Sequence, residues 1–192
     1  KGIRGSLDGE RAAVGTRDLM DDEGVDCAAL EDQIGRLEDK GHTTTVVARG
    51  GRALGALGIA DTLKEDSADA IAELKDMGFE VAMITGDNER TARAIADRVG
   101  IDRVLAEVMP DDKTAEVKRL QGEVGLVAMV GDGINDAPAL TQADVGIALG
   151  SGTDIAIESA DITLVRGELS AVVSGVKLSR ATFRKIKQNL YW

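Results

Sequence analysis

Residues 129–140 read Met-Val-Gly-Asp-Gly-Ile-Asn-Asp-Ala-Pro-Ala-Leu. The apolar strand Leu126–Val130 leads into a turn in which two glycines flank Asp132, and Asn135 and Asp136 follow before a proline opens a helix. Glycines allow the backbone to turn tightly and to approach a ligand closely. Two carboxylates and an amide at this spacing can gather around Mg²⁺, which takes oxygen ligands and usually keeps a phosphate in its shell. The competing interpretation is an Asx-rich turn that caps the helix, and the length of the string favours the Mg²⁺ site.

The same alternation of a short apolar strand with a helix extends on both sides of this stretch, from about residue 53 to residue 168. The expected strands are Ala53–Ala60, Glu80–Ile84, Val104–Glu107, Leu126–Val130, Val145–Ala148 and Ile162–Val165, and the expected helices are Asp66–Met77, one ending at Val99, and Asp111–Gln121. Such an order predicts an α/β fold with a parallel sheet and right-handed crossovers. Sites in such sheets lie at the carboxyl ends of the strands, which directs attention to the loops after Ile84 and after Val130.

The loop after Ile84 reads Thr85-Gly86-Asp87-Asn88 and opens a helix. A hydroxyl and free N–H groups at a helix N-terminus suit a phosphate, whereas an ordinary turn with Asp87 as the N-cap is the alternative. Lys113 lies in the first turn of a later helix, where its charge opposes the helix dipole. It is therefore either a tolerated surface residue or a group held for a phosphate. Together these groups form a phosphoryl-transfer constellation, in which a cation and Mg²⁺ neutralise phosphate oxygens.

Composition limits the possible partners. The chain has 192 residues and a formal net charge of −11, which argues against nucleic-acid binding because phosphate affinity needs clustered Lys and Arg. Cys27 is the only cysteine, so an internal disulfide is not possible and a reducing compartment fits. No apolar run approaches the ~18 residues typical of a membrane-spanning helix.

Two flanking regions differ from the alternating part. Residues 1–52 carry short strand-like runs around a helix-like stretch, Ala28–Asp39, and predict the C-terminal part of a small α/β domain. Residues 169–192 predict an amphipathic helix that lacks acidic residues, carries five basic ones and ends in Leu-Tyr-Trp. This pattern is typical of the cytoplasmic edge of a membrane helix, and an ordinary amphipathic helix with a basic face is the alternative. We therefore predict three regions, 1–52, 53–168 and 169–192.

Three of these motifs resemble those of a known family. Met83–Asn88, Glu107–Lys113 and Val130–Leu140 resemble the hinge and phosphorylation-domain motifs of P-type ATPases, whose phosphorylation domain has the haloacid dehalogenase-like, Rossmann-type fold. The resemblance implies that Thr85, Gly86 and Asp87 hold the phosphoryl group, that Lys113 lies near the aspartyl phosphate, that Asp132 and Asp136 bind Mg²⁺, and that Asn135 and Asp136 support the phosphate site.

Both ends of the chain resemble the heavy-metal branch of that family. Gly2 matches the second glycine of a Gly-x-Gly pair, and Gly15 lies in Val-Gly-Thr where the branch usually has Val-Gly-Asn, so both are implied to line an ATP pocket. Thr16 is the departure from that pattern. The ending Lys185–Trp192 resembles the entry to the penultimate membrane helix of copper-transporting members, which favours copper over zinc.

The family's nucleophile motif, Asp-Lys-Thr-Gly-Thr, does not occur in this sequence. Asp61-Thr-Leu63 is similar to the end of a haloacid dehalogenase nucleophile motif, but the preceding Gly-Ile-Ala lacks the first Asp, and we reject it. The resemblance thus implies a cytoplasmic fragment, inactive alone, of an Mg²⁺- and ATP-dependent export pump in the cell membrane. Its cargo would be a heavy-metal ion, with Cu⁺ favoured, and nucleic acid is not expected as a partner. The alternatives are a fragment of a soluble Mg²⁺-dependent phosphatase of the same superfamily and a non-catalytic nucleotide-binding module.

Overall fold

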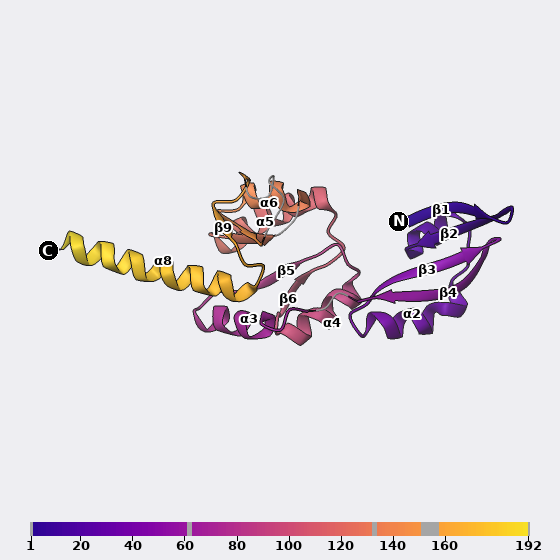
Figure 1. Cartoon of the computed structure of the whole chain (residues 1–192), viewed down its shortest axis with the longest axis horizontal. Coiled ribbons are helices and arrows are strands. Elements are labelled where there is room, and N and C mark those ends of the chain that lie inside the picture. Colours follow the sequence, from indigo (N-terminus) through magenta and orange to yellow (C-terminus); the bar gives the residue numbers. More distant parts are fainter. Residues whose placement is uncertain (1, 61–62, 132–133, 151–157, 192) are drawn as a thin grey trace. The chain divides into compact units, whose positions relative to one another are not determined.

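The computed structural model describes residues 2–60, 63–131, 134–150 and 158–191. The chain divides into two compact units (Figure 1). The first unit comprises residues 1–62 and 87–97, and the second comprises residues 63–86 and 98–192. Helix α4 (Glu89–Val99) begins in the first unit and ends in the second.

The first unit is a four-stranded antiparallel sheet in the order β1-β2-β3-β4. Its strands are β1 (Gly2–Leu7), β2 (Glu10–Gly15), β3 (Thr43–Arg49) and β4 (Arg52–Ile59). The connection from β2 to β3 contains α1 (Arg17–Asp22), the 3₁₀ turn η1 (Ala28–Leu30) and α2 (Glu31–Glu38), which pack against the sheet. A single core lies between these helices and one face of the sheet, with Leu19, Met20, Ile34 and Val46 fully or almost fully buried.

The prediction for strand β4 was wrong, because this strand belongs to the antiparallel sheet. Residues 53–60 were expected to open the parallel sheet, but Arg52–Ile59 pairs antiparallel with β3 from Arg49↔Arg52 to Thr43↔Ile59, with one register shift between Val47 and Ala48. The reason is a hairpin, because Gly50 and Gly51 take φ values of 59° and 77° in the turn between the two strands. Two residues of positive φ give the tight turn whose twist matches that of antiparallel strands.

The second unit contains the predicted alternation of strands and helices. In chain order its elements are α3 (Ser67–Asp76), β5 (Ala82–Ile84), the end of α4, β6 (Arg103–Leu105), η2 (Pro110–Asp112), α5 (Lys113–Val124), β7 (Ala128–Gly131), η3 (Ile134–Asp136), α6 (Ala137–Gln142), β8 (Val145–Leu149), β9 (Ile162–Leu164) and α8 (Leu169–Leu190). The strands are shorter than the apolar runs suggested, except β8, which is one residue longer, and the helices lie within about one turn of the expected positions.

All strand pairs of this unit are parallel, as predicted. β5 pairs with β6, and β7, β8 and β9 form a three-stranded sheet in that order. Ile147 and Leu149 of β8 pack against Val172 of α8 to form the core of the larger sheet. Within the described residues no hydrogen-bonded ladder joins β5 to β7.

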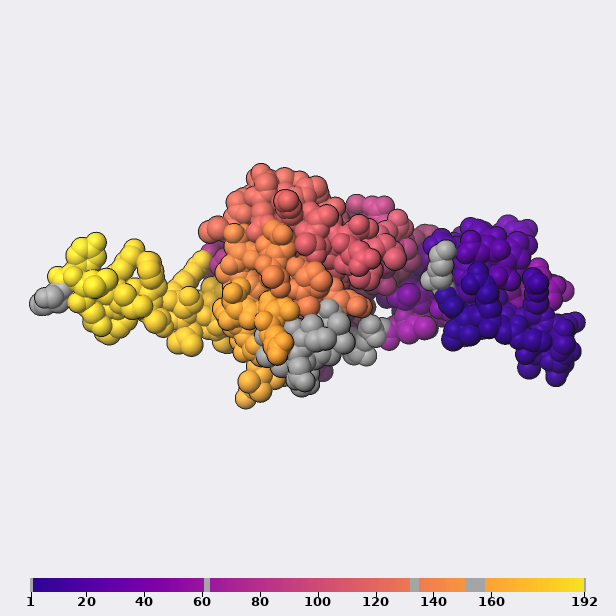
Figure 2. Space-filling model, turned by 90° about the horizontal axis from the view of Figure 1, so that it is seen from above, coloured from indigo at the N-terminus to yellow at the C-terminus, as the bar shows by residue number. Residues whose placement is uncertain are grey.

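Helix α8 is attached to the rest of the second unit through its first half and through Arg180. Val172 and Val173 are buried, and Asp66 accepts a 2.8 Å hydrogen bond from the Ser170 amide, which lowers the pKa of the Asp66 carboxyl. Arg180 lies 5.2 Å from the centre of the Phe79 ring and donates to the Met77 carbonyl. The second half extends beyond the other elements of this unit (yellow in Figures 1 and 2). None of the helices among the described residues has the length and apolar character needed to cross a membrane.

Gly146 is expected to be a stability determinant of the larger sheet. A Cβ at this position would lie 2.7 Å from the carbonyl oxygen and 3.1 Å from the carbonyl carbon of Leu140, so backbone would have to move. We expect Gly146→Ala to lower the free energy of unfolding by about 1–3 kcal/mol, measured by urea denaturation. The control is Gly122→Ala in helix α5, where the added Cβ meets no atom of the described residues within 4 Å and a gain of about 0.5–1 kcal/mol is expected. Equal effects of the two substitutions would contradict the close approach at Gly146.

Candidate functional site

The loop after β5 is held by backbone hydrogen bonds to the last residue of β6 and to the segment that follows it. The Thr85 amide donates to the Leu105 carbonyl over 2.9 Å, and the Val108 amide donates to the Thr85 carbonyl over 3.0 Å. A Cβ on Gly86 would lie 3.4 Å from the Val108 carbonyl oxygen, so this glycine passes close to backbone. The predicted phosphate loop therefore has a fixed backbone at the carboxyl end of a parallel strand, which is where ligands bind in such sheets.

The continuation of this loop belongs to the first unit. Asp87 Oδ1 accepts a 2.9 Å hydrogen bond from the Thr43 hydroxyl. Asn88 Oδ1 accepts a 3.0 Å bond from the Thr91 amide, so Asn88 is the N-cap of α4. The alternative in which Asp87 caps this helix is therefore wrong. The described contact of the Asp87 carboxylate is the one with Thr43.

Lys113 and Asp136 form the best-defined part of the candidate site. Lys113 is the first residue of α5, Asp136 is the last residue of η3, and Lys113 Nζ lies 2.7 Å from Asp136 Oδ1. Their side chains are 18% and 13% exposed, so the pair is largely shielded from water. Gly131 makes room for it, because a Cβ there would lie 2.8 Å from Asp136 Cβ. A lysine in the first turn of a helix, opposed by the helix dipole, is thus held by a carboxylate from another loop.

The remaining residues of the predicted Mg²⁺ site are only partly described. Asp132 lies outside the described residues, and the residue Asn135 is exposed. Among the described residues no group of three or more His, Cys, Asp or Glu side chains is placed to hold a metal ion. Asp136 is the described carboxylate at this position, and Lys113 already contacts one of its oxygens.

The two glycines predicted to line a nucleotide pocket are brought together. Gly2 of β1 is the cross-strand partner of Gly15 of β2. A Cβ on Gly2 would lie 2.2 Å from the Val14 carbonyl oxygen and 2.5 Å from Gly15 Cα, and its φ of 154° also favours glycine. The neighbouring Thr16 hydroxyl oxygen is buried and has no hydrogen-bond partner among the described residues. Buried polar atoms of this kind call for a partner that these residues do not supply.

Sequence reasoning missed an ion pair in the first unit between the buried Glu38 and the partly exposed Arg17. Glu38, the last residue of α2, is 3% exposed and accepts two hydrogen bonds from Arg17, of 2.6 Å and 3.2 Å. The bonds to this carboxylate raise the pKa of Arg17 further above its already high ordinary value. The two residues are 21 positions apart, and local patterns carry no signal that would pair them.

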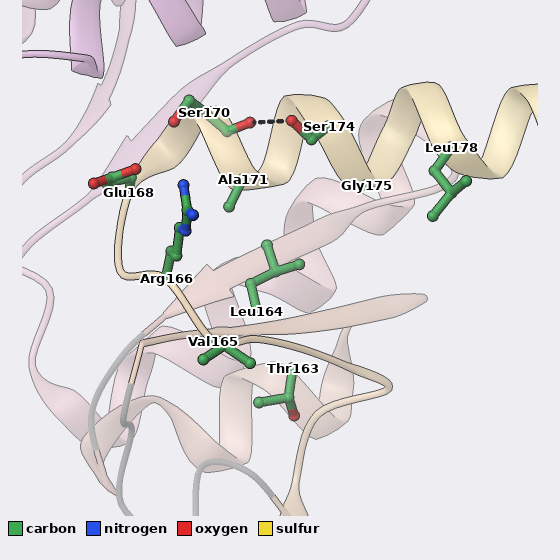
Figure 3. Close-up of a pocket in the computed structure, with 10 residues that line it drawn as sticks. All are labelled: Thr163, Leu164, Val165, Arg166, Glu168, Ser170, Ala171, Ser174, Gly175 and Leu178. Atoms are coloured by element: carbon green, nitrogen blue, oxygen red, sulfur yellow. Dashed lines mark hydrogen bonds between the residues drawn. The ribbon is translucent and has the colours of Figure 1, made fainter.

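A separate groove of about 470 Å³ lies between β9, the loop that follows it and the first turns of α8 (Figure 3). Leu164, Val165, Ala171 and Leu178 supply most of its apolar wall. None of the candidate residues described above lines this groove.

Comparisons with known proteins identify the superfamily of this chain. Residues 3–144 match the family model of haloacid dehalogenase-like hydrolases. The chain is 52% identical over its whole length to the probable copper-exporting P-type ATPase V of Mycobacterium tuberculosis, and 51% identical to the copper-exporting P-type ATPase of Bacillus subtilis. It spans 25% and 24% of the lengths of these two relatives.

A similarity in structure points the same way. The crystal structure of a zinc-transporting PIB-type ATPase matches 98% of this chain with a TM-score of 0.70 and 40% identity, and the match covers 30% of that protein. The family model covers more than half of the chain and includes both loops at the carboxyl ends of β5 and β7. The chain therefore belongs to the haloacid dehalogenase-like hydrolases.

Proposed function

We propose that this chain is part of the cytoplasmic portion of a P-type ATPase that exports a heavy-metal ion and forms an aspartyl phosphate. The observation that carries the proposal is the shielded Lys113–Asp136 pair, in the motifs where the resemblance to P-type ATPases places the phosphate site. Relatives named as copper-exporting P-type ATPases, about half identical over the whole chain, favour Cu⁺ as the cargo.

The proposal assigns a role to each part of the chain. The first unit is the C-terminal part of the nucleotide-binding domain, and the second is most of the phosphorylation domain. Helix α8 leads toward a membrane helix. Support for the last role comes from its second half, where Phe183, Ile186 and Leu190 are 58%, 49% and 78% exposed and the charged residues are all basic. Exposed apolar side chains beside basic ones suit an anionic membrane surface.

Residues of the second unit would hold the transferred phosphoryl group. Lys113 would neutralise phosphoryl oxygens, and Asp136 keeps its ammonium group in place through the 2.7 Å contact. The Thr85 hydroxyl and the N–H groups of the loop would supply hydrogen bonds to the same oxygens. Mg²⁺, when bound by Asp132 and Asp136, would offset the negative charge of the phosphates. The attacking carboxylate would come from the part of the protein outside this sequence.

The first unit offers two features that fit a nucleotide. Gly2 and Gly15, which the resemblance places in the nucleotide motifs, are cross-strand partners in β1 and β2. The buried hydroxyl of Thr16 lacks a partner among the described residues and could bond to a ligand. These features support ATP as the phosphoryl donor.

We also propose where the missing nucleophile strand belongs. β5 and β7 each pair with one described strand only, so each has an edge without a described partner. Met83, Ile84, Met129 and Val130 are only partly buried. Strands of parallel sheets are normally covered on both sides and read as continuous apolar runs. A further strand between β5 and β7 would complete the sheet and place its carboxyl end beside both candidate loops.

The test is metal-dependent phosphorylation of the full-length protein that contains this chain. In membranes supplied with ATP labelled at the γ-phosphate, we expect an acid-stable, hydroxylamine-sensitive phosphoenzyme that forms with Cu⁺ and not with Zn²⁺. Phosphorylation that depends on Zn²⁺ alone would contradict copper as the cargo. A soluble protein that releases phosphate from small phosphomonoesters without metal dependence would establish the phosphatase instead. Nucleotide binding without formation of any phosphoenzyme would indicate a non-catalytic nucleotide-binding module.

A further inference from the structure

Glu38 is placed in a way that helix stability does not explain. It ends α2, where a negative charge is unfavourable because the C-terminus of a helix already carries partial negative charge. It is also buried, and an ionised carboxylate is costly to bury unless it is paired and hydrogen-bonded. These two costs to stability indicate that the role of the Glu38 carboxylate is to hold the side chains that are hydrogen-bonded to it.

Three side chains from different elements of the first unit donate to the Glu38 carboxylate. Arg17 makes a bidentate contact of 2.6 Å and 3.2 Å, the Thr44 hydroxyl donates over 3.1 Å, and Asn88 Nδ2 donates over 3.2 Å. Paired charges with several hydrogen bonds fix geometry more firmly than neutral contacts do. Glu38 thus joins the start of α1, strand β3 and the start of α4 at one point.

Two of these donors are direct neighbours of candidate motifs. Arg17 follows Val14-Gly15-Thr16 without a gap, and Asn88 follows Thr85-Gly86-Asp87 without a gap. Asn88 is in turn fixed by the Thr91 amide, and Asp87 by the Thr43 hydroxyl. The buried Glu38 carboxylate is therefore linked through Arg17 to the predicted nucleotide motif and through Asn88 to the predicted phosphate loop.

We propose that Glu38 is a positioning residue that couples nucleotide binding at Gly15–Thr16 to the placement of the Asp87 loop. The proposal rests on the function proposed above. When a nucleotide moves the start of α1, Arg17 moves with it, and Glu38 passes this displacement to Asn88 and so to Asp87. The coupling acts on phosphoryl transfer from ATP. It does not act on phosphorylation by inorganic phosphate, which needs no nucleotide.

The experiment compares two routes to the same aspartyl phosphate in the full-length protein. Microscopic reversibility allows the phosphoenzyme to form from Mg²⁺-ATP or from Mg²⁺ and inorganic phosphate. We expect Glu38→Ala to slow formation from ATP by about tenfold or more, as small misplacements of reacting groups do. Formation from inorganic phosphate uses the same loop but not the nucleotide motif, so it should be slowed less than formation from ATP. Glu38→Gln keeps an acceptor for Arg17, so its rate of phosphoenzyme formation from ATP is expected to lie between those of the wild type and of Glu38→Ala.

A matched control is Asp39→Asn. Asp39 is the next residue and also bonds to α4, through Arg90, but both side chains of that pair are more than half exposed. Exposed ion pairs of this kind contribute little to stability. Asp39→Asn should therefore leave the rates of phosphoenzyme formation from ATP and from inorganic phosphate unchanged. Equal slowing of both routes by Glu38→Ala would show mere structural support and overturn the coupling. A wild-type protein that forms no phosphoenzyme by either route would overturn the proposed function and the coupling with it.

A rescue variant keeps the test valid if Glu38→Ala folds poorly. Asn88→Asp retains the oxygen that caps α4 but loses the Nδ2 donor, and it should slow the ATP route selectively. Adding Glu38→Gln supplies an amide donor on the opposite side, which restores the hydrogen bond with reversed roles. We expect the double variant to be faster than Asn88→Asp alone. Purely multiplicative effects of the two substitutions would contradict a direct link, because uncoupled sites behave additively in free energy.

Discussion

Lys113→Ala in the full-length protein is expected to slow formation of the aspartyl phosphate by a factor of about 10²–10³, the usual effect of removing one group that stabilises a transferring oxyanion. Lys113 Nζ lies 2.7 Å from Asp136 Oδ1, and the lysine side chain is 18% exposed. A charge that is partly withdrawn from water and already oriented acts on phosphoryl oxygens without reorganisation during the reaction. The rate is measured by rapid-quench phosphorylation with labelled ATP.

The control for this variant is Lys118→Ala on the same helix. Lys118 is exposed, so its removal changes the net charge of the protein equally but should leave the rate within about twofold. Lys113→Ala also leaves the Asp136 carboxylate without its cation, and we expect a loss of about 1–3 kcal/mol in the free energy of unfolding. If both lysine variants kept the wild-type rate, Lys113 would be a surface residue that the helix merely tolerates.

The second unit was predictable because its signals are local. The turn after Val130 follows directly from an apolar strand, and the helix stripes end at glycines, so element order and parallel pairing could be inferred from spacing. The same order placed Thr85 and Asp136 at the carboxyl ends of β5 and β7. The contact between Lys113 and Asp136 could not be derived from the pattern itself, because the residues are 23 positions apart and are joined only by packing.

The first unit was less predictable, for two different reasons. Strand β4 was assigned to the wrong sheet although a signal was present, because Gly50-Gly51 between two strand-like runs is a strong indicator of a hairpin. Strand β1 and helix α1 were not predicted at all. Helix α1 has only six residues, too few for a clear apolar period. The contacts of Glu38 reach residues 21 and 50 positions away, and single-sequence patterns do not encode such distances.

Gly131→Ala, at the end of β7, is expected to disturb the contact between Lys113 and Asp136. The added Cβ would lie 2.8 Å from Asp136 Cβ and 3.0 Å from Asp136 Oδ2. Asp136 cannot easily retreat, because Ala137 and Ala139, which follow it in α6, are buried. Either the carboxylate turns away from Lys113 or β7 shifts in the sheet. We expect phosphoenzyme formation to fall by about 10²-fold, as a displacement of about 1 Å can cause.

A measurement of stability distinguishes this local change in the candidate site from unfolding of the protein. Overpacking at Gly131 should cost about 1–3 kcal/mol, so the variant is assayed at a temperature where circular dichroism shows it folded. Gly175→Ala in α8 is the matched control, because among the described residues its Cβ would meet only Leu164 Cδ2, at an ordinary 3.9 Å. That variant should keep the wild-type rate and gain about 0.5–1 kcal/mol. A folded Gly131→Ala protein with an unchanged rate would mean that Asp136 does not hold Lys113 for the reaction, and the role assigned to this pair would have to be given up.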